Sequence, residues 1–256
     1  GHAQSYLGNY DEAIEAYEYA FIINNKFEFA YRDCAELCFE IKQYRKALRC
    51  YLELLEHIDS DSDVHFCIGQ CYQQLEDYAS ARSYYNQALQ SDPLNDEVLY
   101  CIGECHAEEK RWKSAIRYYQ KALQIEDTRE EYYAALAEAY FEMGDTEKAE
   151  TNFKIALDLA PDQIQIWMQY TGFLIDTDQV DEALEALQEA ESFSIGAEIL
   201  YCRIACLFAL GRRQEAFYWL GEALEEDYDM HRSLFEMMPS LEHDPEVTSL
   251  ISTYLF

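Results

Sequence analysis

The sequence predicts an all-α protein in which antiparallel helical hairpins stack into a solenoid. Three observations lead to this fold class: a pattern that repeats every 34 residues, helical spacing within each repeat, and few residues that break helices. The chain of 256 residues has only 4 prolines and 9 glycines, whereas Ala, Leu, Glu and Gln are abundant, which favours long helices over strands. A hydrophobic content of 50% is enough for a continuous core.

Three ladders of residues define the repeat. Alanines recur every 34 residues, with a last step of 33, at Ala13, Ala47, Ala81, Ala115, Ala149, Ala183 and Ala216. A second ladder in the same phase comprises Ala20, Ala88, Ala122, Ala156, Ala190 and Ala223, and Leu54 takes its remaining place. Between the two stand Tyr17, Tyr51, Tyr85, Tyr119 and Phe153, with Leu187 and Leu220 in the last two repeats. Spacings of three and four residues place all three ladders on one helix face, where alanines admit a neighbouring helix and rings fill the gap.

Another helix precedes each of these ladder helices. Its apolar residues also follow helical spacing, as in Leu99, Ile102 and Cys105. Short polar breaks separate the two helices, at Gly8-Asn9, Glu76-Asp77, Gly144-Asp145 and Gly211-Arg212. Each repeat is therefore predicted to be a helix-turn-helix hairpin.

The residues that repeat also carry a resemblance to a known family. One repeat contains Ile68-Gly69, Tyr72, Ala81, Tyr85, Ala88 and Pro93, another contains Trp167, Ala183 and Ala190, and Pro161 supplies a second terminal proline. With the 34-residue period, this pattern resembles tetratricopeptide repeats, and the resemblance implies a right-handed superhelical solenoid. Ala35, Ala137 and Thr171 stand where the family has a first-helix glycine, and Arg203-Ile204 replaces Leu-Gly, so we expect wider or shifted helix crossings there.

The phase of the alanines divides the chain into segments. Residues 1–27 hold the end of a first helix and a complete second helix, so we expect the array to begin inside a repeat. Complete repeats are predicted over 28–61, 62–95, 96–129, 130–163, 164–196 and 197–230. The period then stops, and Asp244-Pro245-Glu246 has the N-cap, the N1 proline and the early acid of a new helix. We predict a repeat array over 1–230 and C-terminal capping helices over 231–256, in which Val247, Leu250, Ile251 and Tyr254 cover the last hairpin.

Charge and cysteine content narrow the partners and the location. The chain has 50 acidic and 19 basic side chains, a net charge of −31, which makes nucleic acid and anionic membranes unfavourable partners. The longest apolar stretch, Ile199 to Leu210, contains Arg203 and is too short to span a bilayer, so we interpret it as a buried helix. Nine cysteines in a long, well-cored chain indicate a reducing compartment, and we predict a cytoplasmic location.

The resemblance implies that the first helix of each hairpin lines a concave, partner-binding groove. On the alanine phase, this groove presents Phe29, Arg32, Glu36, Phe39, Glu40, Phe66, Gln70, Gln73, Tyr100, Glu104, Glu108, Ala134, Glu138, Phe141, Glu142, Met168, Gly172, Asp176, Tyr201 and Phe208. Relatives that clamp the carboxyl termini of chaperones use Lys, Arg and Asn there, whereas Arg32 stands nearly alone. An acidic, aromatic groove should prefer an apolar segment that bears Lys or Arg. The alternative is that the acids only solvate the fold.

The cysteines invite a second interpretation as a metal site. Cys34 and Cys38, Cys67 and Cys71, Cys101 and Cys105, and Cys202 and Cys206 are each four residues apart, and His65 and His106 lie nearby in sequence, a ligand set compatible with zinc. Core packing is the competing interpretation, because free cysteine behaves as a small hydrophobe. We predict packing and no metal or other cofactor.

The sequence favours binding over catalysis. It contains no nucleophile elbow, phosphate-binding glycine loop, zinc-protease motif or dinucleotide fingerprint. We therefore predict a protein-protein interaction scaffold and not an enzyme, with a protein or peptide as partner and the oligomeric state left open. Two alternatives remain: a chaperone for a secreted or aggregation-prone client, or a recruitment module of a larger protein.

Overall fold

The computed structural model describes residues 5, 7–24, 28–58, 61–193 and 196–254. Over this part of the chain the regular secondary structure is helical, with no strand, which confirms the predicted all-α fold class. The chain separates into two compact units, Gly1–Asp127 and Thr128–Phe256, here called unit 1 and unit 2. The predicted end of a first helix at the start of the chain falls mostly outside the described residues.

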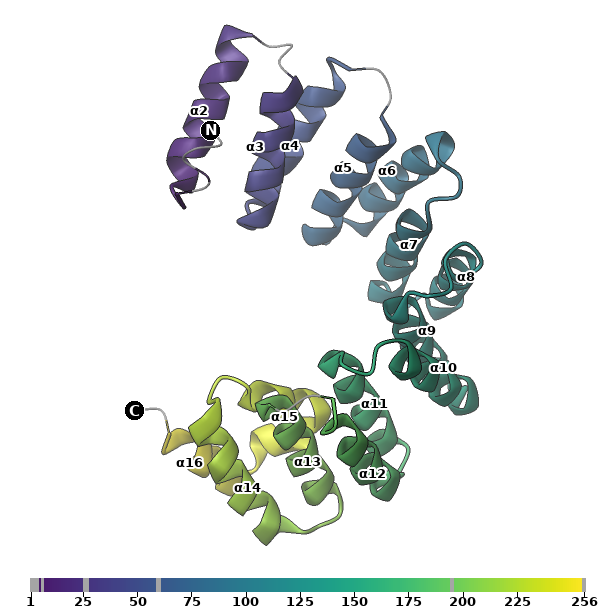
Figure 1. Cartoon of the computed structure of the whole chain (residues 1–256), viewed down its shortest axis with the longest axis vertical. Coiled ribbons are helices and arrows are strands. Elements are labelled where there is room, and N and C mark those ends of the chain that lie inside the picture. Colours follow the sequence, from purple (N-terminus) through teal and green to yellow (C-terminus); the bar gives the residue numbers. More distant parts are fainter. Residues whose placement is uncertain (1–4, 6, 25–27, 59–60, 194–195, 255–256) are drawn as a thin grey trace. The chain divides into compact units, whose positions relative to one another are not determined.

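Unit 1 consists of stacked helical hairpins (Figure 1). Its helices are α2 (Tyr10–Ile23), α3 (Glu28–Glu40), α4 (Tyr44–Leu55), α5 (Ser62–Gln74), α6 (Tyr78–Ser91), α7 (Asp96–Glu108) and α8 (Trp112–Leu123). Helix α3 packs on α4, α5 on α6 and α7 on α8, and the second helices α2, α4 and α6 also contact the first helices α3, α5 and α7. The first helices α3, α5 and α7 thus form one layer and the second helices α4, α6 and α8 form the other.

The repeated residues form the core between these layers. Ala47, Ala81 and Ala115 have no exposed surface, and the rings of the middle ladder are also buried. The α5–α6 hairpin shows why a small residue is needed opposite the ring. A Cβ atom added to Gly69 would lie 2.4 Å from Cε1 of Tyr85, far inside van der Waals contact. Glycine therefore lets the Tyr85 ring lie directly against the backbone of the partner helix.

The turn inside each hairpin has one recurring geometry. Its key residue adopts a positive φ in all the described hairpins, at Gly8, Lys42, Glu76, Lys110, Gly144, Asp178 and Gly211. After α5, the N–H of Glu76 donates to the Gln73 carbonyl and the N–H of Asp77 to the Tyr72 carbonyl, both at 2.9 Å. This pair of bonds is the Schellman motif, and it recurs after α3, α7, α9, α11 and α13. Left-handed backbone costs a non-glycine residue about 1–2 kcal/mol, so four of these turns carry strain.

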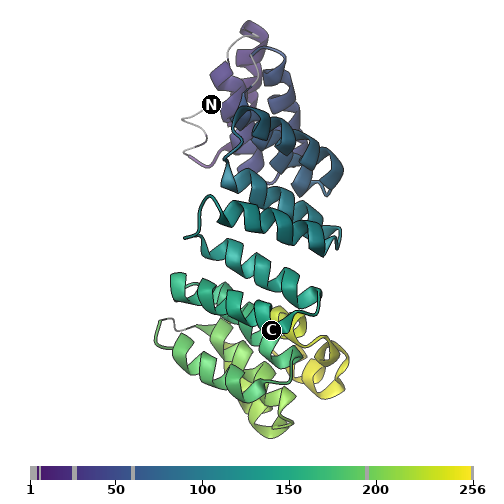
Figure 2. The same ribbon diagram turned by 90° about the vertical axis from the view of Figure 1, so that its right-hand side faces the viewer.

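Unit 2 continues the hairpins and ends in shorter helices (Figure 2). Its helices are α9 (Glu130–Glu142), α10 (Thr146–Leu159), α11 (Ile164–Asp176), α12 (Val180–Ala190), α13 (Ala197–Ala209), α14 (Arg213–Glu226), α15 (His231–Met237), the 3₁₀ helix η1 (Pro239–His243) and α16 (Pro245–Ser252). The predicted helix start at Asp244 is confirmed, because its side chain accepts hydrogen bonds from the N–H groups of Glu246 and Val247. Val247 and Ile251 are buried in a core shared with α13 and α14.

The departures from the family pattern in unit 2 compensate one another. Thr171 and Ile204 occupy the place of the first-helix glycine, and both are fully buried. In the same two hairpins, Leu187 and Leu220 take the place of the aromatic ring. A larger residue on the first helix is therefore matched by a smaller one on the second, which keeps the volume between the helices similar.

Candidate protein-binding surface

The predicted groove residues of unit 1 belong to α3, α5 and α7, and their solvent-facing side is here called the A face. Phe29 is the most open ring, with 71% of its surface exposed. Exposed carboxylates are Glu36, Glu40 and Glu108, and the half-buried members are Arg32, Phe39, Phe66, Gln70, Gln73, Tyr100 and Glu104. Every predicted residue of unit 1 therefore reaches solvent at least in part.

Two half-buried rings of the A face rest on rings of the core. Phe66 on α5 lies with its ring centroid 5.8 Å from that of Tyr85, and Tyr100 on α7 lies 5.5 Å from Tyr119. Because both supporting tyrosines are fully enclosed, the two surface rings are held in place from below. Pre-positioned aromatic side chains lose little conformational entropy when a partner binds, which makes them good anchors.

The same core tyrosines reach the A face through their hydroxyl groups. Tyr85 donates a hydrogen bond to Oε1 of Gln73 at 2.6 Å, and Tyr119 donates to Oε1 of Glu104. Burial raises the pKa of Glu104, although the hydrogen bond from Tyr119 opposes this by stabilising the carboxylate. Gln73 on α5 and Glu104 on α7 are therefore polar groups of the A face that the core tyrosines hold in place.

The charge of the A face is strongly negative because its one cation is already paired. Arg32 donates to Oδ2 of Asp61 at 3.0 Å, and Asp61 also caps α5 by accepting from the N–H of Asp63. Burial alone would raise the pKa of Asp61, but these hydrogen bonds outweigh it and hold the pKa below its ordinary value. The helices α3, α5 and α7 contain nine carboxylates and no basic residue besides Arg32. A basic group on a partner would therefore meet uncompensated negative charge.

In unit 2 the predicted residues divide between accessible and enclosed positions. Glu138, Glu142 and Asp176 are exposed, and Glu138 accepts a hydrogen bond from Gln169 at 2.7 Å. Phe141 is half-buried, with its ring edge against Phe173 at 5.3 Å between centroids. Gly172 is also half-buried, whereas Ala134 is buried. Partial burial raises the pKa of Asp176.

Ala134 and three larger predicted groove residues are enclosed and cannot contact a partner. Met168, Tyr201 and Phe208 are buried, and the Tyr201 hydroxyl donates to the Asp227 carbonyl at 2.9 Å inside unit 2. For Tyr201 and Phe208 the reason is that α13 contacts α11, α12, α14 and α15, so it has no open side comparable to that of α5 or α7. We remove these three residues and Ala134 from the predicted binding set. The apolar run from Ile199 to Leu210 was the sequence signal for this burial.

The comparisons with known proteins identify the repeats. Sequence models of the tetratricopeptide repeat match residues 68–129 and residues 1–26, and the model of anaphase-promoting complex, cyclosome, subunit 3 matches residues 108–190. These segments contain five of the seven buried ladder alanines and the contact between Gly69 and Tyr85. The chain belongs to the tetratricopeptide-repeat family. A tetratricopeptide-repeat fold of this kind implies a protein-protein interaction scaffold. No curated protein matches the chain.

Solved structures show the same fold at low sequence identity. A tetratricopeptide repeat protein from Parabacteroides merdae has a TM-score of 0.71 and 14% identity, with 100% of this chain and 96% of that chain covered. Yeast Tom70 has a TM-score of 0.70 and 18% identity, with 96% of this chain and 54% of Tom70 covered. PilF of Pseudomonas aeruginosa has a TM-score of 0.63 and 20% identity, with 91% and 99% covered. These likenesses establish the tetratricopeptide fold alone.

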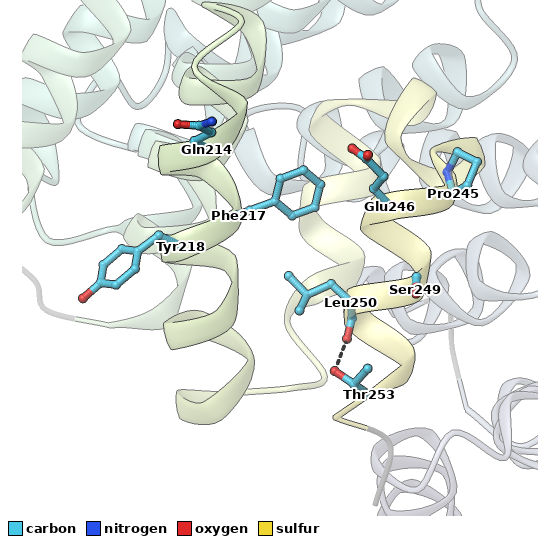
Figure 3. Close-up of a pocket in the computed structure, with 8 residues that line it drawn as sticks. All are labelled: Gln214, Phe217, Tyr218, Pro245, Glu246, Ser249, Leu250 and Thr253. Atoms are coloured by element: carbon cyan, nitrogen blue, oxygen red, sulfur yellow. Dashed lines mark hydrogen bonds between the residues drawn. The ribbon is translucent and has the colours of Figure 1, made fainter.

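One hollow in this tetratricopeptide-repeat protein was not predicted. It lies between α14 and α16 at the end of unit 2, has a volume of about 770 Å³ and opens to solvent (Figure 3). Its lining comprises Gln214, Phe217, Tyr218, Pro245, Glu246, Ser249, Leu250 and Thr253. Tyr218 is 62% exposed, whereas Phe217 and Leu250 are half-buried. Phe217 and Tyr218 stand outside the three ladders, so the repeat analysis passed over them.

Seven of the nine cysteines of the tetratricopeptide repeats are buried in the core, and Cys67 and Cys101 are half-buried. Cys34, Cys38, Cys71, Cys105 and Cys206 have almost no exposed surface, and all nine cysteines are free thiols. Burial raises the pKa of the Cys71 and Cys105 thiols to about 12, so both stay neutral. Among the described residues, no group of three or more His, Cys, Asp or Glu is arranged to hold a metal ion. Within the same residues, no helix is long and apolar enough to cross a bilayer.

Proposed function

We propose that the A face of unit 1 binds an extended or helical segment of another protein that carries apolar and basic side chains. The observation that supports this most is that supported rings and fixed polar groups share one face: Phe66 and Tyr100 rest on buried tyrosines, and the same tyrosines hold Gln73 and Glu104 by hydrogen bonds. Aromatic anchors supply binding energy where water is excluded, and surrounding carboxylates select and steer a basic partner. Binding, not catalysis, is the proposed role.

The rings and the charges make separable contributions to this proposal. Removing Phe66 or Tyr100 should weaken binding by about 2 kcal/mol each, the usual size for a central aromatic anchor, mainly through faster dissociation. Neutralising exposed carboxylates should instead slow association and reduce the salt dependence of affinity. Because the carboxylates are exposed, their effect should fade when the screening length falls from about 10 Å at 0.1 M salt to about 3 Å at 1 M.

A titration of labelled peptides tests the proposal. One peptide carries Lys and Leu in amphipathic helical spacing, and the other has Glu in place of each Lys. The test variant carries Glu36→Gln, Glu40→Gln and Glu108→Gln, and the matched control carries Glu182→Gln, Glu185→Gln and Glu189→Gln, three exposed carboxylates of α12. We expect the basic peptide to bind and only the test variant to bind it less well. Equal binding of the two peptides, or equal loss in the two variants, would contradict a specific A face.

A chaperone for aggregation-prone clients is the alternative function, and we also propose a cytoplasmic location. A chaperone should bind many unfolded chains with similar affinity, so the same titration with unrelated reduced, unfolded proteins distinguishes it from a selective scaffold. The cytoplasmic proposal rests on nine cysteines that are all free thiols, which is the usual state in a reducing compartment.

A further inference from the structure

In the three hairpins from α3 to α8, most acidic and basic side chains lie on different layers of helices. The first helices α3, α5 and α7 hold nine carboxylates and one cation, whereas the second helices α4, α6 and α8 hold seven cations and a single carboxylate, Glu53. The turns before α4 and α8 add Lys42, Lys110 and Arg111 to the second layer. In these three hairpins the first helices are therefore acidic and the second helices basic. Helix α2, the second helix of the preceding partial hairpin, is acidic, with Asp11, Glu12, Glu15 and Glu18.

This polarity is not a general property of second helices in the chain. In unit 2 the corresponding helices α10, α12 and α14 contain eleven carboxylates and only three cations. Both layers of unit 2 are thus acidic, as expected for a chain with a net charge of −31. A positive layer in such a chain is an exception confined to α4, α6 and α8.

The densest part of the positive layer is α8 with the turn before it. Residues 110–121 contain five cations and no carboxylate. Lys113 and Arg117 are exposed, Lys121 lies with its Nζ 4.9 Å from the centre of the Tyr118 ring, and all three share one stripe of the helix because they are four residues apart. A stripe of this length spans about 12 Å. Like charges at this spacing weaken a helix, so the fold itself gains nothing from them.

The stripe has no acidic partner among the described residues. In unit 1, Arg49 forms an ion pair with Glu18, and Arg82 forms an ion pair with Glu109 at 2.6 Å. Lys113 and Arg117 take part in none of the ion pairs of the described chain, and neither do Arg45 and Lys46 on α4. Between α4 and α8, helix α6 contributes no carboxylate. The exposed side of α4 and α8, with Arg45, Lys46, Lys113, Arg117 and Lys121, is here called the basic face.

We propose that the basic face of unit 1 is a second interaction surface, which binds an acidic segment of a partner protein. Charges separated by more than about 8 Å are largely screened at physiological salt, so a bound segment would sense the local cations and not the net charge of −31. A short acidic polypeptide fits a patch of this size. A long nucleic acid would extend beyond the patch to carboxylates of unit 1 such as Glu18 and Glu53, and it is therefore the less suitable polyanion. The A face and the basic face would then select partners of opposite charge.

The test compares two charge reversals of equal size on second helices. The variant Lys113→Glu with Arg117→Glu removes the stripe on α8. The matched control, Lys148→Glu with Lys154→Glu, reverses two exposed lysines on α10 in unit 2, where each already has a carboxylate partner. All four side chains are exposed, so both variants should fold, and circular dichroism checks this. The probe is a fluorescein-labelled peptide of sixteen residues, roughly 24 Å long when helical, that alternates Glu and Ala.

We expect the probe to bind the wild-type chain, to bind the α8 variant at least tenfold less tightly, and to bind the control within twofold of wild type at 150 mM salt. Three results would overturn the proposal: no binding up to 1 mM probe, an equal loss in both variants, or tighter binding of a sixteen-nucleotide oligouridine than of the peptide. Sedimentation of the wild type and the α8 variant measures their oligomeric state and can give a fourth result that would overturn the proposal. If the wild type self-associates through Lys113 and Arg117, the occupant is a second copy and the proposal of a separate acidic partner is wrong.

Discussion

Replacing Gly69 by alanine should destabilise the α5–α6 hairpin by about 1–3 kcal/mol, although alanine is the better helix former. The added Cβ atom would lie 2.4 Å from Cε1 and 2.5 Å from Cδ1 of Tyr85, whereas carbon atoms normally approach no closer than about 3.5 Å. The ring must therefore move by roughly 1 Å. It is fully buried, so either the ring or the whole helix has to shift.

Two further terms set the size of the effect. Moving the ring strains the hydrogen bond from the Tyr85 hydroxyl to Gln73, at 2.6 Å, which contributes about 1 kcal/mol. In the opposite direction, alanine gains about 1 kcal/mol over glycine inside a helix. These two terms nearly cancel, so the measured loss should be close to the cost of overpacking, about 1–3 kcal/mol. Ala35 holds the corresponding place in the α3–α4 hairpin, where it is fully buried together with Tyr51, so a hairpin of this fold can be built around a methyl group at this position.

Urea unfolding followed by circular dichroism measures the loss, and amide hydrogen exchange shows whether it is confined to α5 and α6. Gly172→Ala is the matched control, because nothing lies within 4 Å of a Cβ atom added to this glycine of α11. It should stabilise the protein by up to about 1 kcal/mol. A second control is Gly69→Ala combined with Tyr85→Leu, in which the alanine should cost at least about 1 kcal/mol less. Stabilisation by Gly69→Ala alone would refute the reasoning.

Three other predictions concern the turns, the cap and the thiols. Glu76→Gly should raise the free energy of unfolding by about 0.5–1 kcal/mol, because Glu76 has a φ of 60°, which glycine adopts without strain. The urea midpoint should rise accordingly, and an unchanged or lower midpoint contradicts this. Arg213→Ala should reduce exchange protection in α16, and this difference from wild type should vanish at low pH. The hydrogen bonds from Arg213 hold the pKa of Asp244 below its ordinary value. The stabilisation by this pair is therefore present above the unfolded-state pKa of about 4 and is lost as the pH falls through the folded-state pKa of Asp244. A difference between Arg213→Ala and wild type that persists at pH 2 contradicts this prediction. Cys71 and Cys105, buried with pKa values of about 12, should resist iodoacetamide at pH 8 until urea unfolds the chain, and labelling in the native state contradicts this.

The covered side of most helices was predictable because it depends on short-range spacing. The alanine ladder is buried at all seven positions, since residues three and four apart necessarily share a helix face. The start of α16 at Pro245 was predictable for a similar reason, because an N-cap acts only on its own first turn. The positive φ at Lys42, Glu76 and Lys110 was not visible in the same way. These residues have no sequence preference for the left-handed region, and the hairpin imposes it.

The candidate surface was predictable only in part. Phe66, Tyr100 and Glu104 reach solvent as expected, whereas Tyr201 and Phe208 are enclosed although they hold comparable places in the repeat. The position of a residue in the repeat predicts which side of its own helix the side chain lies on. The exposure of that side chain depends on which other helices cover this side. For α13, part of the cover is α15, which lies outside the repeat.

The sequence alone determined the family, the hairpin repeat and the buried stripe of each helix, because periodicity, capping and small-residue spacing act within a turn or two of one helix. Tertiary structure decided which first-helix residues are accessible, how Tyr85 and Tyr119 support the A face, and that the cations of unit 1 collect on one layer. Each of these depends on contacts between helices that are far apart in the chain, and no local pattern records which helix lies beside which.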